Sequence, residues 1–182
     1  MKKICVFCGS SSGNNSKYKN IAKDLGTLLA KNNFGLVFGG GKVGIMGVLA
    51  ASVMSGGGEV IGVIPEKLCT DALVKRDVTK LYVVKDMHER KAKMADLSDA
   101  FIALPGGIGT LEEFAEAVTW NQLDIHKKPC SLLNIEGYFN HFISFLGHMV
   151  KENFFSESEK SLIVVEKEPG ILIKRLKEKL DA

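Results

Sequence analysis

Glu113 has a residue type and a position that could support chemistry on a phosphate-bearing ligand. It lies in the run LPGGIGTLEEF, residues 104–114, a few residues after a glycine-rich turn. Such a turn lets backbone N–H groups approach an oxyanion, and the helix that follows adds the positive end of its dipole. A carboxylate beside a phosphate is unfavourable unless the ligand develops positive charge. The oxocarbenium-like transition state of glycosidic bond cleavage develops that charge, so Glu113 is a candidate catalytic carboxylate.

The same glutamate also has a structural explanation. Residues 110–113, TLEE, match the S/T-x-x-E pattern of a capping box, in which the carboxylate of Glu113 would accept the backbone N–H of Thr110. We predict the catalytic role first and the capping role second. One helical turn further on, Glu116 and Thr119 are expected to line the same site.

An arginine interrupts an apolar stripe in residues 87–98, MHERKAKMADLS. One helix face carries Met87, Arg90, Met94 and Leu97. A guanidinium that snorkels to solvent is one explanation of this arginine. The other is that Arg90, with Lys91 beside it, lies over the strand ends and binds a phosphate or carboxylate, which suits the planar fork of arginine.

Three glycine turns are each followed by a predicted helix. They read CGSSSG (8–13), GGGKVGIMG (39–47) and PGGIGT (105–110). A single turn of this kind is explained by backbone geometry, whereas three on one edge predict an anionic ligand, a phosphate-bearing nucleotide. Residues 39–44 also fit the dinucleotide pattern G-x-G-x-x-G, with Glu66 where a ribose-binding acid would lie. That alternative stays open, although the motif follows the second strand and leaves the third turn unexplained.

The elements that must position these residues alternate between strand and helix. Apolar, β-branched runs predict strands at 3–7, 34–38, 59–64, 80–84, 100–104, 129–134 and 162–165. Helices are expected near 16–32, 43–56, 87–97, 110–124, 138–151 and 168–180. This order predicts an α/β fold in one domain, 1–182: a Rossmann-like, doubly wound, mainly parallel sheet of about seven strands with helices on both faces. Residues 66–79 are the least regular part, and we expect a loop there.

Composition narrows the classes of partner. The 182 residues carry a net charge of +3, which does not by itself indicate nucleic acid or a membrane surface as a partner. No apolar run is long enough for a membrane span or a signal peptide, so we expect a cytoplasmic protein with reduced cysteines. Cys5 and Cys8 form a C-x-x-C on a predicted strand, where they would point to opposite faces as small buried residues. We expect neither a metal nor a cofactor.

Several motifs together resemble the LONELY GUY family of cytokinin riboside 5′-monophosphate phosphoribohydrolases. They are CVFCGSSSG, FGGGKVGIMG, VIGVIP, MHERK, PGGIGTLEEF and the run from Trp120 to Pro129, in order and spacing from about residue 3 to Tyr138. The resemblance implies a homodimer that hydrolyses a nucleoside 5′-monophosphate to a free base and ribose 5-phosphate. Members are often mislabelled as lysine decarboxylases, whose chemistry normally needs a pyridoxal phosphate Schiff-base lysine. We interpret Lys42 and Lys91 instead as phosphate partners.

The resemblance implies Arg90 and Glu113 as the functional pair. Together with the glycine turns it gives the expected substrate-binding set: Gly9, Ser10, Gly40, Gly41, Gly44, Met87, Lys91, Pro105, Gly106, Gly107, Ile108, Gly109, Thr110, Leu111, Glu112 and Thr119. Two departures, Asp124 in place of the usual glycine and the poorly matching 66–79 loop, leave the preferred base open. The alternative function is a non-catalytic carrier of a nucleotide or nucleotide cofactor on the same fold.

Overall fold

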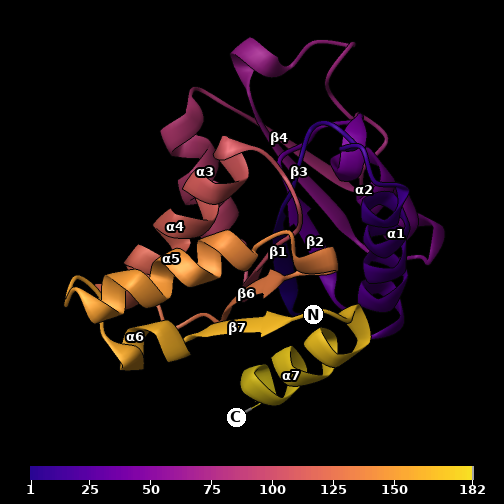
Figure 1. Ribbon diagram of the computed structural model, residues 1–182. Coiled ribbons are helices and arrows are strands. Elements are labelled where there is room, and N and C mark those ends of the chain that lie inside the picture. The colour runs from indigo at the N-terminus through magenta and orange to yellow at the C-terminus, as the bar shows by residue number, and fades with distance from the viewer. Residues whose placement is uncertain (182) are drawn as a thin grey trace.

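Short β-branched and aromatic runs form a parallel sheet in the computed structural model, which describes residues 1–181 (Figure 1). Within that range the seven strands are β1 (Lys3–Phe7), β2 (Gly35–Phe38), β3 (Val60–Pro65), β4 (Lys80–Val84), β5 (Ala100–Ala103), β6 (Cys130–Leu133) and β7 (Ile163–Glu166). Their order is β4-β3-β2-β1-β5-β6-β7, and every neighbouring pair is parallel. The topological switch point, where the strand order reverses, lies between β1 and β5. Doubly wound sheets bind ligands at this point. The predicted fold class is therefore confirmed.

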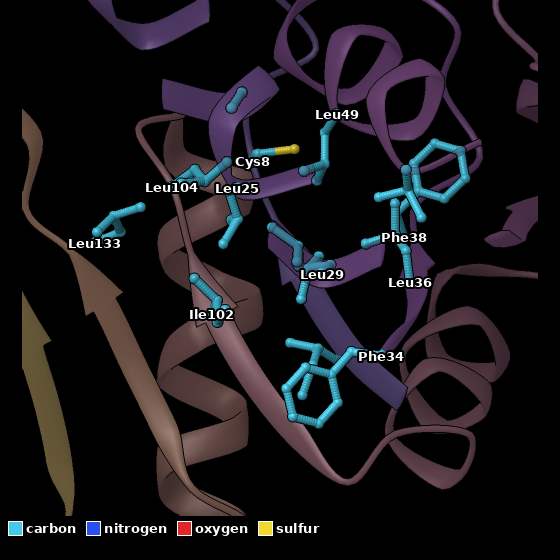
Figure 2. Close-up of a cluster of buried hydrophobic side chains, with 14 of the residues drawn as sticks. Cys8, Leu25, Leu29, Phe34, Leu36, Phe38, Leu49, Ile102, Leu104 and Leu133 are labelled. Carbon is cyan, nitrogen blue, oxygen red and sulfur yellow. The ribbon is translucent and has the colours of Figure 1, made fainter. Parts of the chain in front are cut away.

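Helices cover both faces of this sheet. They are α1 (Ser16–Lys31), α2 (Gly44–Ser55), α3 (Met87–Asp96), α4 (Ile108–Gln122), α5 (Asn140–Lys151), α6 (Glu157–Ser161) and α7 (Pro169–Asp181), with 3₁₀ turns at Glu66–Leu68 and Ile135–Gly137. Buried residues of α1, α2 and α7 form one apolar cluster, and those of α3, α4 and α5 form another. Figure 2 shows part of the first cluster, where Leu25 and Leu29 of α1 approach Leu49 of α2. Among residues 1–181, no helix combines the length and the apolarity needed to cross a bilayer.

Alternation along β1 divides its side chains between these clusters. Ile4, Val6 and Cys8 belong to the first, whereas Cys5 and Phe7 belong to the second. The two cysteines of the C-x-x-C are therefore buried on opposite faces of the sheet, as predicted, because successive strand residues point in opposite directions.

Element boundaries differ from the predictions at a few places. Helix α4 begins at Ile108, two residues earlier than expected. The short helix α6 was not predicted, although its Ser156 and Glu159 form a capping box. Within the expected loop 66–79, a 3₁₀ turn covers Glu66–Leu68 and Val74 forms an isolated antiparallel bridge with Gly41. The spacing of apolar residues along the sequence does not predict such local features.

Candidate active site

A cavity of about 480 Å³ lies at the carboxyl ends of β1, β2, β3 and β5. Its lining includes the residues that follow three of these strands: Cys8 to Ser10, Gly39 with Gly41, and Gly107 to Thr110. The size falls in the range of about 300–1,000 Å³ that is usual for sites of small ligands. The three glycine turns therefore meet around one cavity, as their positions after parallel strands indicated.

Arg90 enters this cavity from the first turn of α3. The side chain of Asp86 caps that helix by accepting the backbone N–H groups of His88 and Glu89. The Arg90 side chain is buried, with 6% of the residue exposed, so the snorkelling explanation is wrong. Its Nε donates to the Val63 carbonyl at 3.2 Å, and its Nη1 donates to Glu113 Oε1 at 2.5 Å. Arginine and glutamate thus form a buried ion pair between α3 and α4.

The capping-box prediction for Glu113 is also wrong. The residue at the N-cap of α4 is Gly107, and Thr110 lies inside the first turn with its N–H already donated to the Gly107 carbonyl at 3.1 Å. Since the helix begins before Thr110, the carboxylate of Glu113 has no cap to complete. It lies one turn further on and binds the guanidinium of Arg90 instead.

Two opposing effects act on the charge of Glu113. Burial raises the pKa of its carboxyl group, because the charged form is poorly solvated there. The guanidinium of Arg90 opposes this effect by charge and by hydrogen bonding, and the net shift remains upward. The pair therefore places a carboxyl group with a raised pKa, held by a guanidinium, in the wall of the cavity.

Close contacts between the glycine turns depend on the missing side chains. A Cβ added to Gly39 would lie 2.0 Å from Nη2 of Arg90, so this glycine gives the guanidinium its space. Gly44 has a φ of +65°, and a Cβ there would lie 2.3 Å from the Ser10 carbonyl oxygen. The backbone N–H of Gly9 donates to the Pro105 carbonyl at 3.1 Å. These contacts fix the first, second and third turns against one another.

Helix α4 directs its amino end into the cavity. Gly107, Ile108 and Gly109 are exposed and line it, and no side chain of residues 1–181 caps this helix end by a hydrogen bond. A helix N-terminus of this kind offers backbone N–H groups and the positive end of a dipole, which together favour a phosphate.

The structure brings some of the expected site residues to the cavity and not others. Those that line it are Gly9, Ser10, Gly41, Met87, Arg90, Gly107, Ile108, Gly109, Thr110 and Glu113. Those outside its lining are Gly40, Gly44, Lys91, Pro105, Gly106, Leu111, Glu112 and Thr119. Pro105 and Gly106 line a neighbouring pocket of about 190 Å³ beside Tyr18 and Tyr138.

Both lysines interpreted as phosphate partners have protein partners instead. Lys91 forms ion pairs with Glu112 and, at 3.1 Å, with Glu116, while its side chain is only 10% exposed. Lys42 donates to the Asp71 carbonyl. Thr119 donates its hydroxyl to the Ala115 carbonyl at 2.8 Å and lines an apolar pocket between α4 and α5. In each case the partner of the side chain is a residue outside the cavity lining.

The expected set of substrate-binding residues left out much of the apolar part of the cavity, although four of the residues concerned lie within the predicted glycine turns. The additional lining residues are Cys8, Gly39, Val43, Met46, Ile64, Leu68 and Leu73. Gly39 and Ile64 lie at strand ends, which is a signal that could have identified them. Leu68 and Leu73 lie in the irregular loop 66–79, where no period indicates which side chains turn inward.

A family model and curated relatives both match most of this chain. The family model described as "Possible lysine decarboxylase" matches residues 46–176. The cytokinin riboside 5′-monophosphate phosphoribohydrolase LOG1 of Arabidopsis thaliana is 50% identical over 177 residues, covering 97% of this chain and 83% of the relative. The phosphoribohydrolase LOG of Oryza sativa subsp. japonica is 45% identical over 177 residues, covering 97% of this chain and 73% of the relative.

Solved structures share the fold at lower identity. The molybdenum cofactor carrier protein of Chlamydomonas reinhardtii superposes with a TM-score of 0.74 at 22% identity, covering all of this chain and 99% of the other. The molybdenum cofactor binding protein of Rippkaea orientalis gives a TM-score of 0.73 at 24% identity, covering 99% of this chain and 98% of the other. At these identities the likeness shows the fold.

Proposed function

This chain belongs to the LONELY GUY family of phosphoribohydrolases, and we propose that it hydrolyses the N-glycosidic bond of a nucleoside 5′-monophosphate. Water would attack C1′ of the ribose, the bond to the base nitrogen would break, and the products would be a free base and ribose 5-phosphate. The observation that carries this proposal is the buried Arg90–Glu113 pair in the wall of a cavity surrounded by glycine turns.

The chemistry of the bond gives each residue a role. Positive charge develops at C1′ and the ring oxygen as the bond to the base breaks. The carboxylate of Glu113 stabilises that charge and orients the attacking water. Arg90 holds the carboxylate in place, and its remaining N–H donors are available to the ribose or phosphate. The N–H groups at the start of α4 bind the phosphate.

Lysine decarboxylation is supported less well by the side chains of this chain. That chemistry normally uses a lysine as a Schiff base with pyridoxal phosphate. Lys91 is paired with two carboxylates, and Lys42 donates to a backbone carbonyl of the 66–79 loop. Neither amine is presented to the cavity as a nucleophile would be.

The substitution Glu113→Gln tests the proposed role of the carboxylate. Glutamine keeps the size and one oxygen acceptor of the side chain but removes the charge, and it avoids the empty space that alanine would leave. We expect the release of free base from adenosine 5′-monophosphate or N6-isopentenyladenosine 5′-monophosphate to fall at least about 100-fold, with substrate binding largely retained.

Glu178→Gln on the exposed face of α7 is the matched control and should retain wild-type turnover. Wild-type protein that releases no base from any monophosphate at high enzyme concentration would contradict the proposed reaction. Tight retention of a nucleotide without turnover would favour the alternative of a carrier.

The oligomeric state of the protein and its location in the cell are also proposals. We infer a homodimer, supported by the large apolar residues Ile108 and Phe154, which are 83% and 86% exposed. A second copy of the chain would cover such residues and so remove apolar surface from water. A cytoplasmic location remains a prediction from the sequence.

A further inference from the structure

A tyrosine outside the main cavity is hydrogen-bonded to the glycine turn that begins α4. The Tyr138 hydroxyl donates to the carbonyl oxygen of Gly106 at 2.5 Å, although the two residues are 32 positions apart in sequence. Both residues line the neighbouring pocket of about 190 Å³, and so does Gly107. Gly107 lines the main cavity as well, so this turn forms a wall that the two pockets share.

The position of Tyr138 is fixed without its hydroxyl group. The residue follows β6 and a 3₁₀ turn, and its N–H donates to the Ile135 carbonyl at 2.9 Å. The buried side chain of Asn134 accepts the N–H of Phe139 at 2.7 Å. The Tyr138 ring packs edge to face against the rings of Tyr18 and Phe139, with centroid separations of 5.6 and 5.1 Å. The hydroxyl is therefore not needed to anchor its own segment, and its bond acts on the glycine turn.

Donors from other segments hold two successive carbonyl groups of this turn. The N–H of Gly9, in the turn after β1, binds the Pro105 carbonyl at 3.1 Å. The Tyr138 hydroxyl binds the next carbonyl, that of Gly106. No peptide bond within residues 1–181 is cis, and the C=O and N–H of a planar trans peptide point in opposite directions. Tyr138 therefore directs the N–H of Gly107 away from its own pocket and toward the main cavity, which Gly107 also lines.

The first N–H groups of this turn and helix have no acceptor within the protein. Among residues 1–181, no hydrogen bond uses the N–H of Gly107, Ile108 or Gly109. Free N–H groups at a helix N-terminus are suited to binding a phosphate. In the same part of the chain, a Cβ added to Gly107 or Gly109 would meet nothing within 4 Å, so packing does not restrict these residues. The direction of the N–H groups therefore depends on the hydrogen bonds that hold the carbonyl groups before them.

We propose that Tyr138 is a positioning residue for the phosphate of the substrate. Its hydroxyl fixes the peptide between Gly106 and Gly107, so that the N–H groups at the start of α4 point at one anion before the ligand arrives. Donors that are ordered in advance bind more tightly, because less ordering is required on binding. Tyr138 acts through the glycine turn and does not touch the ligand. This inference rests on the proposed hydrolysis for the identity of the ligand, a nucleoside 5′-monophosphate.

The substitution Tyr138→Phe tests the proposal, because it removes the hydroxyl and keeps the ring that packs against Tyr18 and Phe139. We expect KM for adenosine 5′-monophosphate to rise about five- to tenfold, the factor that corresponds to losing one neutral hydrogen bond. The value of kcat should change less than about twofold, since the phosphate is bound equally in the ground state and the transition state. Tyr82→Phe is the matched control, because it removes a hydroxyl from β4, outside the lining of both pockets.

The separate effects on KM and kcat distinguish positioning of the phosphate from a general structural role. An unchanged KM in Tyr138→Phe protein would overturn the proposal, whatever happens to kcat. A rise in KM together with a clear fall in kcat would also overturn it, because loss of the hydroxyl would then disturb the catalytic groups as well as the phosphate site.

Calorimetric binding to Glu113→Gln proteins separates this inference from the proposed hydrolysis. In that background Tyr138→Phe should weaken the binding of adenosine 5′-monophosphate and of ribose 5-phosphate by the same factor, even if the wild type shows no turnover. Equal affinities for adenosine 5′-monophosphate with and without the hydroxyl would overturn the positioning role while leaving hydrolysis to its own test. A loss confined to adenosine 5′-monophosphate would also overturn it, because the hydroxyl would then affect the base rather than the phosphate.

Discussion

Glu113 is a carboxylate whose charge depends on a residue 23 positions away in sequence. Burial raises its pKa, while Arg90 and, more weakly, Lys91 lower it, and Glu112 raises it. Lys91 forms ion pairs with Glu112 and Glu116 and does not line the cavity. Its influence on the site is electrostatic, because its positive charge lowers the pKa of Glu113. Removing one member of a buried ion pair leaves an unpaired buried charge, typically at a cost of about 3–5 kcal/mol. The Arg90–Glu113 pair is therefore expected to tolerate conservative changes only.

The raised pKa of Glu113 predicts an acid limb in the pH profile of activity. If the ionised carboxylate is required, kcat/KM should fall with decreasing pH through a midpoint above 4.5, the ordinary value for glutamate. Because Lys91 lowers this pKa, Lys91→Ala should move the midpoint to higher pH. The measurement is kcat/KM against pH for wild type and variant.

Lys127→Ala is the control, since Lys127 pairs with Asp124 on an exposed surface. An acid limb at the same pH in wild type and Lys91→Ala would contradict the proposed influence of Lys91. The pH dependence of stability should have the opposite sign to that of activity. A raised folded-state pKa gives a contribution that is present below about pH 4.5 and is lost as the pH rises through the raised value. Glu113→Gln should remove this dependence.

At the scale of elements, the site is built by packing three strand-to-helix turns against each other. The turn after β2 begins α2 and also contacts the turn after β1, where Gly44 lies against the carbonyl of Ser10. Gly39 of the same turn accommodates the guanidinium carried by α3. The position of Arg90 therefore depends on how closely the turns approach, as well as on α3 itself.

Substituting two glycines with similar backbone angles should separate packing from backbone strain. Gly44 and Gly57 have φ values of +65° and +76°, but within residues 1–181 an added Cβ at Gly57 meets nothing within 4 Å. Gly57→Ala should lower the free energy of unfolding by about 1–2 kcal/mol, the cost of a left-handed conformation. Gly44→Ala should lower it clearly further, because the Ser10 backbone must move.

Urea unfolding of both variants measures this difference. Equal losses of stability would mean that the turns after β1 and β2 are free to separate at Gly44. A loss of activity in folded Gly44→Ala protein, with activity retained in Gly57→Ala, would connect that packing to the site.

At the scale of the whole molecule, the two helix layers bury both faces of the sheet but leave apolar residues exposed near α4 and α5. An apolar pocket of about 210 Å³ lies there, lined by Phe114, Val118, Thr119, Phe142, Leu146, Met149 and Phe154 among others. Phe154 is 86% exposed, and Ile108 at the start of α4 is 83% exposed while it also lines the cavity. A surface of this kind near a candidate active site is typical of a subunit interface.

We therefore expect wild-type protein to sediment at twice the chain mass of 19.8 kDa. Phe154→Ser should shift the population toward the monomer, because it removes a large aromatic anchor from the expected interface. Ile171→Ser, which changes an exposed residue of α7, should leave the mass unchanged. A monomeric wild type over the micromolar range would contradict the homodimer.

The sequence by itself determined the seven strands, the glycine turns and the residue types available for catalysis. Alternation and short apolar runs are local, so β1 to β7 could be placed within a residue or two of their observed bounds. The carboxyl ends of parallel strands lie at one edge of the sheet, so glycine turns that follow these strands lie at that edge. The alternation of strands and helices therefore predicted that the turns meet around one site.

Tertiary structure alone decided which partner each side chain takes. The pattern TLEE fits a cap equally well, and only the start of α4 at Ile108 and the position of Arg90 direct Glu113 into an ion pair. Lys91 forms ion pairs with two carboxylates of α4. Leu73 lines the cavity because its backbone carbonyl accepts a hydrogen bond from the turn after β2. Such contacts join segments about 20–30 residues apart in these cases, and their geometry depends on how helices pack rather than on any period in the sequence.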